Sequence, residues 1–227
     1  FYYRWSTKKT RASQPNEAAS LVKTQIEEVA SHKEGTIYIA LPGGRGAVPV
    51  VEGIVALEDQ ILKRLSLYLV DERLTGSTNR DTLLNVGLQV AIDGGRFKEE
   101  QLHSPQLNTP ILKEGIHFDL VYLGIGEDGH IASLYPQAYP QLDAKGTEDI
   151  VYIADSPKPP PERLTFTFRA FKRYAKEAKV YLLFFGEGKR VAYERFLEGR
   201  ESPSTLPALY FPREWFNFEI ITDLEEK

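Results

Sequence analysis

The chain has 227 residues, of which 42% are hydrophobic and 26% are charged, and its formal net charge is −4. This composition is ordinary for a soluble globular protein, and the mild negative charge argues against non-specific nucleic-acid binding. The absence of cysteine excludes disulfides, thiolate catalysis and Cys-type zinc sites.

Helical and β-type patterns alternate along the chain. Helices are expected where apolar residues recur at helical spacing, at 15–34, 50–57, 83–90 and 188–197. Strands are expected at the short β-rich or apolar runs 36–41, 65–70, 118–123, 150–153, 164–168, 180–185 and 218–221. The alternation predicts an α/β fold with a mainly parallel sheet covered by helices on both faces.

Only residues 156–161, Ser-Pro-Lys-Pro-Pro-Pro, resemble a linker. The segment that follows is too short for a separate domain, so we interpret this stretch as a stiff loop over the same sheet and residues 1–227 as a single domain. No apolar run approaches membrane-spanning length, and the first residues lack a signal-peptide pattern. We therefore expect a cytoplasmic protein without a membrane partner.

The first polar turn after a predicted strand is Gly43-Gly44-Arg45-Gly46. Consecutive glycines before a helix expose backbone N–H groups to an anion, and the helix N-terminus adds positive potential. Arg45 could add a bidentate phosphate contact. A plain strand-to-helix turn explains this segment equally well, and a P-loop is excluded because the Gly-Lys-Ser/Thr ending is absent.

The second is Asp71-Glu72-Arg73, which ends the run 65–70 and is followed by Asn79. Three charges at the end of a buried strand indicate a candidate site. For this motif taken alone, a solvated rim with a structural ion pair is the slightly better interpretation.

The third, residues 124–136 (GIGEDGHIASLYP), is the most informative segment. It matches the dinucleotide-binding pattern G-x-G-x-x-G after a strand. However, Glu127 and Asp128 would bring negative charge against a pyrophosphate. Pro136 and Pro140 would also cut short the helix that should follow. We therefore reject a nicotinamide cofactor.

The same loop contains an acid and a histidine. His130 could take a proton from water near neutral pH, with Asp128 orienting its ring or stabilising its charged form. Ser133 lacks the context of a nucleophile elbow, so a serine hydrolase is not expected. No set of residues has metal-ligand spacing, and we predict no metal. The other histidines are interpreted as structural or surface residues: His32, His103 and His117.

The fourth polar region that follows the predicted strands contains two basic residues. Arg163 follows the proline stretch, and Lys189 lies in Gly186-Glu187-Gly188-Lys189, where a predicted strand meets a helix. Each taken alone is best explained as a surface charge. Together with Arg45 they could form a phosphate cradle from three distant segments.

These motifs, in this order, resemble 6-phosphogluconolactonases, within the superfamily that includes glucosamine-6-phosphate isomerase/deaminase. The resemblance spans most of the chain, and Asp-Gly-His-Ile-Ala-Ser-Leu-Tyr-Pro is its most specific part. The matching pieces are Leu41-Pro42-Gly43-Gly44, Asp71-Glu72-Arg73, residues 124–136, residues 160–165 and Gly186-Glu187-Gly188-Lys189.

The resemblance implies a Rossmann-like fold and hydrolysis of 6-phospho-D-glucono-1,5-lactone in the oxidative pentose phosphate pathway, without a cofactor. His130 would activate the attacking water with Asp128 nearby. Arg73 would steady the charge on the lactone oxygen, and Asp71 would hold that strand end. The phosphosugar would be held by Gly43, Gly44, Arg45, Asn79, Arg163 and Lys189. We expect a monomer or a small homo-oligomer.

Two alternatives remain at this point. The deaminase branch typically has Asp-Glu-Tyr at 71–73 and Phe-Asn-Glu-Pro at 133–136, where this chain has Arg73 and Ser-Leu-Tyr-Pro. A non-catalytic sugar-phosphate sensor would usually carry a DNA-binding segment, and residues 1–34 do not resemble one.

The chain also departs from the lactonase pattern. Arg45-Gly46 replaces the usual Ser or Thr after the glycine turn, and the segment between Arg73 and Asn79 is shortened.

Overall fold

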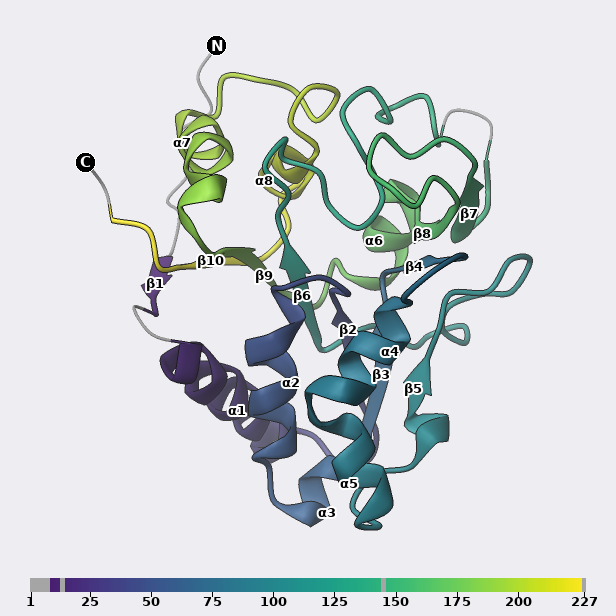
Figure 1. Ribbon diagram of the computed structural model, residues 1–227, viewed down its shortest axis with the longest axis vertical. Coiled ribbons are helices and arrows are strands. Elements are labelled where there is room, and N and C mark those ends of the chain that lie inside the picture. The colour runs from purple at the N-terminus through teal and green to yellow at the C-terminus, as the bar shows by residue number, and fades with distance from the viewer. Residues whose placement is uncertain (1–8, 13–14, 144–145, 226–227) are drawn as a thin grey trace.

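The computed structural model describes residues 9–12, 15–143 and 146–225. Its centre is a parallel sheet of seven strands in the order β1-β10-β9-β6-β2-β3-β5 (Figure 1). Each neighbouring pair of strands is parallel, so their carboxyl ends lie along one edge of the sheet. The strands are β1 (Lys9–Arg11), β2 (Ile37–Leu41), β3 (Leu65–Leu69), β5 (Leu102–His103), β6 (Leu120–Gly124), β9 (Lys179–Phe184) and β10 (Phe218–Thr222).

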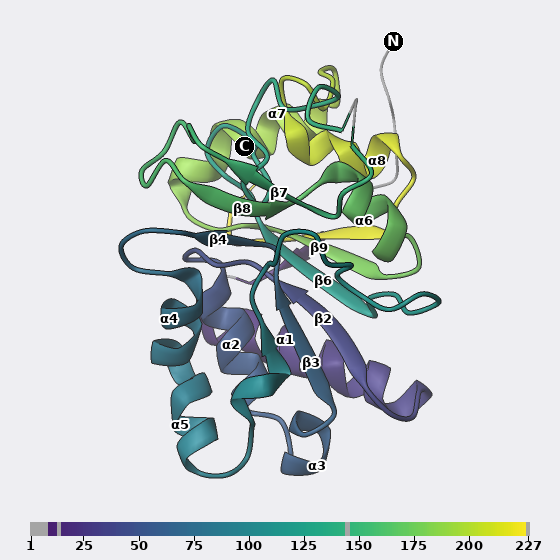
Figure 2. The same cartoon turned by 90° about the vertical axis from the view of Figure 1, so that its right-hand side faces the viewer.

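A layer of helices covers one face of this sheet (Figure 2). Side chains alternate between the two faces along each strand, so Leu120 and Tyr122 of β6 point into this layer while Val121 and Leu123 point into the opposite one. The helical segments of this half are α1 (Pro15–His32), α2 (Ala47–Val55), α3 (Asp59–Leu62), α4 (Asn79–Leu83), the π-turn η1 (Leu84–Leu88), α5 (Gln89–Asp93) and the short η2 (Glu99–Gln101).

The opposite face carries a second, antiparallel sheet of order β4-β8-β7 together with further helices (Figure 2). Its strands are β4 (Asp71–Arg73), β7 (Ile150–Ile153) and β8 (Arg163–Phe166). The register of β4 and β8 pairs Asp71 with Thr165 and Arg73 with Arg163. The helices are α6 (Phe168–Tyr174), η3 (Glu187–Lys189), α7 (Arg190–Glu198), η4 (Pro207–Leu209) and α8 (Tyr210–Arg213).

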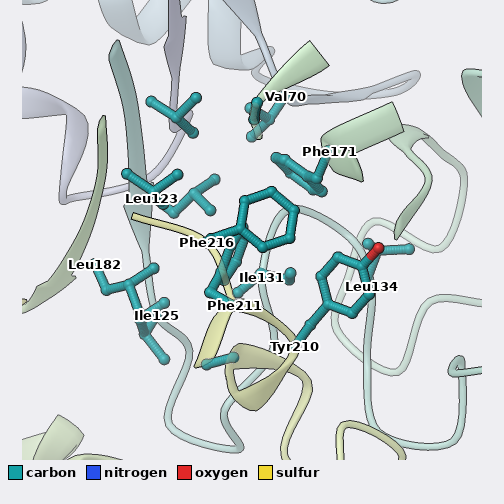
Figure 3. Packing of buried hydrophobic residues seen from close by; sticks show 14 of the residues in the cluster. Val70, Leu123, Ile125, Ile131, Leu134, Phe171, Leu182, Tyr210, Phe211 and Phe216 are labelled. Atoms are coloured by element: carbon teal, nitrogen blue, oxygen red, sulfur yellow. The ribbon is translucent and has the colours of Figure 1, made fainter. Parts of the chain in front are cut away.

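One apolar cluster joins the two sheets (Figure 3). Val70, Leu123 and Leu182 come from the region of the large sheet, and Phe171 and Phe211 come from the helices above it. Figure 3 also shows Ile125, Ile131 and Leu134, which flank the polar turn after β6. All three are buried, so the fold anchors this turn from both sides.

The predicted α/β class, with a mainly parallel sheet and helices on both faces, is confirmed. The second sheet was not predicted: β4 begins almost immediately after β3, and its partner β8 lies far away along the chain. Residues 156–161 form a loop, which connects two strands of the small sheet, β7 and β8. No helix within the described ranges is long and apolar enough to cross a bilayer.

The C-terminal boundary predicted for the strand at 164–168 is wrong, because β8 ends at Phe166. Thr167 has extended backbone angles and its side chain accepts a hydrogen bond from the Ala170 N–H, which makes it the N-cap of α6. Phe168 is therefore the first residue of a helix.

Candidate active site

A pocket of about 650 Å³ opens where the carboxyl ends of the central strands approach the small sheet. Its walls are the turn after β2, strand β4, the loop after β6, the β7–β8 connection and the turn after β9. All but one of the residues predicted for the site line it: Gly43, Gly44, Arg45, Asp71, Arg73, Asn79, His130, Arg163 and Lys189. The exception, Asp128, binds the ring of His130.

The glycine turn connects β2 to α2. The N–H groups of Ala47 and Val48 bond to the carbonyl oxygens of Gly44 and Arg45, which winds the first turn of the helix. A Cβ on Gly44 would meet nothing within 4 Å, whereas a Cβ on Gly43 would lie 2.1 Å from Cγ of Asn79. Gly43 is thus required by the packing of Asn79, and Gly44 leaves the pocket open.

Asp71 is buried and fully engaged at the floor of the pocket. Its Oδ2 accepts a hydrogen bond from Oγ of Ser133 at 2.7 Å, and its Oδ1 accepts one from Nδ2 of Asn79 at 3.3 Å. Burial raises the pKa of Asp71, although the Ser133 hydrogen bond and three nearby basic side chains oppose the shift. Ser133, for which the sequence analysis rejected a role as nucleophile, therefore connects the loop after β6 to β4.

Glu72 closes the short loop between β4 and α4. Its carboxylate accepts hydrogen bonds from three backbone N–H groups, those of Arg73 at 2.7 Å, Asn79 at 2.6 Å and Arg80 at 2.9 Å. These bonds fix the backbone on either side of residues 74–78. The sequence carried no local signal for this role, because two of the three donors, Asn79 and Arg80, come from a segment several residues away.

Arg73 has an unusual environment. Its Nε is buried and has no hydrogen-bond partner among the described residues. Most buried polar atoms in folded proteins are paired, so the orphaned Nε makes Arg73, which also lines the pocket, a candidate for contact with a ligand or a water molecule.

His130 and Asp128 form a coupled pair at the wall of the pocket. Nδ1 of His130 lies 2.5 Å from Oδ1 of Asp128, which also accepts the His130 backbone N–H at 3.0 Å. Partial burial alone would raise the pKa of Asp128, but its hydrogen bonds and attraction to His130, together with the charge of Lys158, lower that pKa to about 2. An ionised Asp128 fixes the Nδ1–H tautomer and leaves Nε2 of His130 as a proton acceptor.

Two glycines of this turn leave space for neighbouring side chains, one of which is the ring of His130. A Cβ on Gly126 would lie 2.0 Å from Nδ1 of His130, and a Cβ on Gly129, where φ is +82°, would lie 2.1 Å from Cδ1 of Leu206. The ring of Tyr135 packs against the other side of the histidine, with ring centroids 4.5 Å apart. Residues 127–143 contain no helix, which agrees with the rejection of a dinucleotide site.

Basic side chains from three segments also line the pocket: Arg45, Lys158 and Lys189. Burial lowers the pKa of Lys189, the charges of Lys158 and Arg45 add to this effect, and Glu127 and Asp128 oppose it. In the described part of the chain, Arg45, Lys158 and Lys189 form no ion pair with a carboxylate. Unpaired cations converging on one cavity favour an anionic ligand.

The sequence analysis missed one of these cations. Lys158 lines the pocket from the β7–β8 connection, but its position in a proline stretch suggested only a loop. Arg163 differs from its predicted environment, because it is 5% exposed and donates to the carbonyl oxygens of residues 158–160.

A larger cavity of about 1080 Å³ lies beside β5 and contains none of the predicted site residues. Its arginines already have partners: Arg80 donates to the Leu102 carbonyl oxygen at 2.7 Å, and Arg173 contacts Asp149 at 3.4 Å. Within the described ranges, no group of three or more His, Asp or Glu side chains is arranged to hold a metal ion.

The family model for glucosamine-6-phosphate isomerases/6-phosphogluconolactonase matches residues 9–216. The chain belongs to this family. A member from Mycobacterium bovis, a 6-phosphogluconolactonase, is 40% identical over 197 residues, which cover 77% of each chain. A probable chloroplastic 6-phosphogluconolactonase 3 from Oryza sativa subsp. indica is 42% identical over 175 residues, 77% of this chain and 45% of the rice protein.

Solved structures of the family agree with the fold. A 6-phosphogluconolactonase from Thermotoga maritima has a TM-score of 0.71 and 20% identity, covering 96% of this chain and 99% of the other. A monomeric glucosamine-6-phosphate deaminase has a TM-score of 0.68 and 16% identity, covering 95% and 96%. The fold is therefore common to both branches of the family. The chain spans less than half of the length of the first rice relatives that it matches.

Proposed function

We propose that this chain hydrolyses 6-phospho-D-glucono-1,5-lactone to 6-phospho-D-gluconate, acting as a single lactonase domain over residues 1–227. The observation that carries the proposal is the environment of His130. Its Nδ1 is bound to an ionised Asp128, and its ring lines a pocket that also contains Arg73 and a set of unpaired cations. A positioned base beside an anion site suits hydrolysis of a phosphorylated ester.

In the proposed reaction Nε2 of His130 accepts a proton from water, and the water oxygen bonds to the lactone carbonyl carbon. The carbonyl oxygen becomes negative and is stabilised by the positive charge of the Arg73 guanidinium, which lines the pocket. The bond between this carbon and the ring oxygen then breaks. The proton on His130 passes to the departing ring oxygen, so one water is consumed and the histidine is restored.

Asp128 and Asp71 have supporting roles in this proposal. The negative charge of Asp128 stabilises the protonated imidazole and fixes the ring orientation through the 2.5 Å contact with Nδ1. Asp71 holds β4 against the loop after β6 through Ser133 and against α4 through Asn79. Asp71 thereby holds the strand of Arg73 beside the loop of His130, and Asp128 orients the histidine ring.

The phosphate would bind beside the basic side chains that line the pocket. Arg45 and Lys189 supply positive charge there, and the dipole of α2 adds positive potential at its N-terminus. Binding energy from a phosphate remote from the carbonyl fixes the orientation of the lactone and assists the chemical step.

A comparison of substrates tests this proposal. Freshly prepared 6-phosphogluconolactone should be hydrolysed well above its spontaneous rate, and glucosamine 6-phosphate should not be deaminated. Arg73 and Tyr135 occupy the positions where the deaminase branch has tyrosine and glutamate, which favours the lactone. Deamination would support the other branch of the family, and binding of phosphogluconate without turnover would support a sensor.

Substitution of Gly126 by alanine should abolish most of this activity by displacing the ring of His130. The added Cβ would lie 2.0 Å from Nδ1 of His130, so the ring must leave its hydrogen bond with Asp128. We expect kcat to fall by about 10²-fold or more, as for loss of a general base. Gly146→Ala is the matched control, since its Cβ would meet nothing closer than 3.9 Å. Full activity of Gly126→Ala would contradict the assigned position of the ring.

A further inference from the structure

The loop after β6 folds back on itself directly after His130. The N–H of Leu134 donates to the carbonyl oxygen of Ile131 at 2.8 Å, and these two residues form an isolated antiparallel bridge. Ala132, between them, has a φ of +48°, a left-handed conformation that a residue with a Cβ adopts rarely and only where its surroundings impose it. Because the bridge closes a tight turn, the two residues that flank it, His130 and Tyr135, become neighbours.

The ring of Tyr135 adds a second restraint to the imidazole of His130. Asp128 holds the imidazole at one atom, Nδ1, through the 2.5 Å contact. A ring held at a single atom can still turn about that hydrogen bond. Tyr135 limits this motion, because its ring packs on the imidazole with 4.5 Å between centroids and 35° between planes, a favourable arrangement for an aromatic pair. Tyr135 is itself only 7% exposed, so neighbouring side chains hold it in place.

The aromatic ring of Tyr135, rather than its hydroxyl group, makes this contact. The hydroxyl forms no hydrogen bond with a residue that the structure describes, and it is not one of the buried polar atoms that lack a partner. In the proposed reaction His130 becomes a cation when it accepts a proton from water. A cation within about 6 Å of an aromatic face is attracted to it, so the ring also favours the protonated form of the histidine.

We propose that Tyr135 is a positioning residue for the general base. Its ring keeps the imidazole of His130 in the orientation that Asp128 selects, and it supports the charge that the imidazole acquires during the reaction. This inference rests on the proposed function, because it assigns a role in the same reaction. The turn at Ala132 is the local structure that makes this role possible, since it brings Tyr135 back to the histidine.

Two substitutions separate the ring of Tyr135 from its hydroxyl group. Tyr135→Phe removes only the hydroxyl, and Tyr135→Leu replaces the ring by an apolar side chain, with Tyr135→Met as the substitute if the leucine variant does not fold. Tyr139→Leu is the matched control, because Tyr139 belongs to the same loop but its ring packs on Phe168 and Tyr210. Each variant is measured for kcat, KM and the Kd of 6-phosphogluconate, and thermal melts establish that it is folded.

We expect Tyr135→Leu to lower kcat by about ten- to a hundredfold, because a displacement of about 1 Å in a reacting group can cost a factor of that size. The KM for the lactone and the Kd for phosphogluconate should stay close to the wild-type values, since the basic side chains that line the pocket lie on other segments. Tyr135→Phe should keep most of the wild-type kcat. Tyr139→Leu should lower the melting temperature and leave kcat unchanged.

A wild-type kcat in Tyr135→Leu would overturn the inference. Equal losses of kcat in Tyr135→Phe and Tyr135→Leu would also overturn it, because the effect would then belong to the hydroxyl group. A raised KM with an unchanged kcat would show that the ring binds the substrate instead of positioning the base. A loss of kcat of the same size in Tyr139→Leu would reduce the effect to a general loosening of the loop.

A wild-type protein without lactonase activity would instead contradict the proposed function. In that event the nitrogen NMR resonances of the histidine rings decide the inference. The chain has four histidines, and the signal that disappears in His130→Asn is that of His130. The wild-type protein and Tyr135→Phe should show a fixed Nδ1–H tautomer for this ring, and Tyr135→Leu should show an average of the two tautomers. A fixed tautomer in Tyr135→Leu would overturn the inference.

Discussion

Replacement of His130 by asparagine should lower kcat for lactone hydrolysis by about 10²–10⁴-fold, the contribution of a positioned general base. The asparagine amide can still donate to Oδ1 of Asp128, so the loop keeps the contact now made by Nδ1. The variant lacks an acceptor in the place of Nε2, and water is no longer deprotonated. The KM should change little, because the phosphate contacts lie on other segments. Initial rates corrected for spontaneous hydrolysis measure the effect.

His32→Asn provides the matched control. His32 lies at the end of α1, its side chain is 73% exposed and it pairs with Glu28 in the same helix, so its loss should leave kcat unchanged. Near-native kcat in His130→Asn would show that another group activates the water. A loss of the same size in both variants would point to a general effect of histidine removal on the fold.

The sequence was most informative where one element carries its own pattern. The run 180–185 is apolar on both faces, and β9 is indeed a central strand between β10 and β6. Polar residues after such runs had to meet at the carboxyl edge of a parallel sheet. That rule alone brought Gly44, Asp71, His130 and Lys189 to one pocket, although they come from four distant segments.

The sequence was least informative where a contact depends on tertiary register. Strand β4 has only three residues and is defined by antiparallel pairing with β8. The register partner of Arg73 is Arg163, which lies in a distant part of the sequence. Such pairing has no local periodicity. For the same reason, the sequence could not predict the hydrogen bond from Ser133 to Asp71 or the packing of Asn79 against Gly43. In each pair the two residues are far apart in sequence.

The environment of Arg163 could not be predicted from the sequence, for a chemical reason. Arg163 was weighed as a surface charge and as part of a phosphate cradle, and Lys158, an exposed lysine among prolines, has no periodic or motif signal. The structure supplies what was missing, namely that the Arg163 guanidinium binds carbonyls of its own loop. The direction of a buried arginine's donors can be known only once the loop is folded around it.

Substitution of Arg73 by alanine should produce the second large effect, with opposite consequences for rate and stability. Loss of one preorganised donor at a developing oxyanion costs about 10²–10³-fold in kcat. The buried Nε of Arg73 has no hydrogen-bond partner among the residues that the structure describes, and an unsatisfied buried donor costs about 1–3 kcal/mol. Its removal should therefore leave the free energy of unfolding equal to or above the wild-type value, as measured by chemical denaturation alongside kcat.

Arg80→Ala is the counterpart that separates catalysis from folding. Arg80 lies close by in α4, but its guanidinium donates to the Leu102 carbonyl oxygen at 2.7 Å and pairs with Glu99. Its loss should lower stability and leave kcat unchanged, the reverse of Arg73→Ala. If Arg73→Ala instead lost stability in proportion to activity, the arginine would be a structural link between β4 and β8, and the oxyanion would need a different donor. A favourable or neutral change in stability with a collapsed kcat is the signature of a binding energy reserved for the transition state.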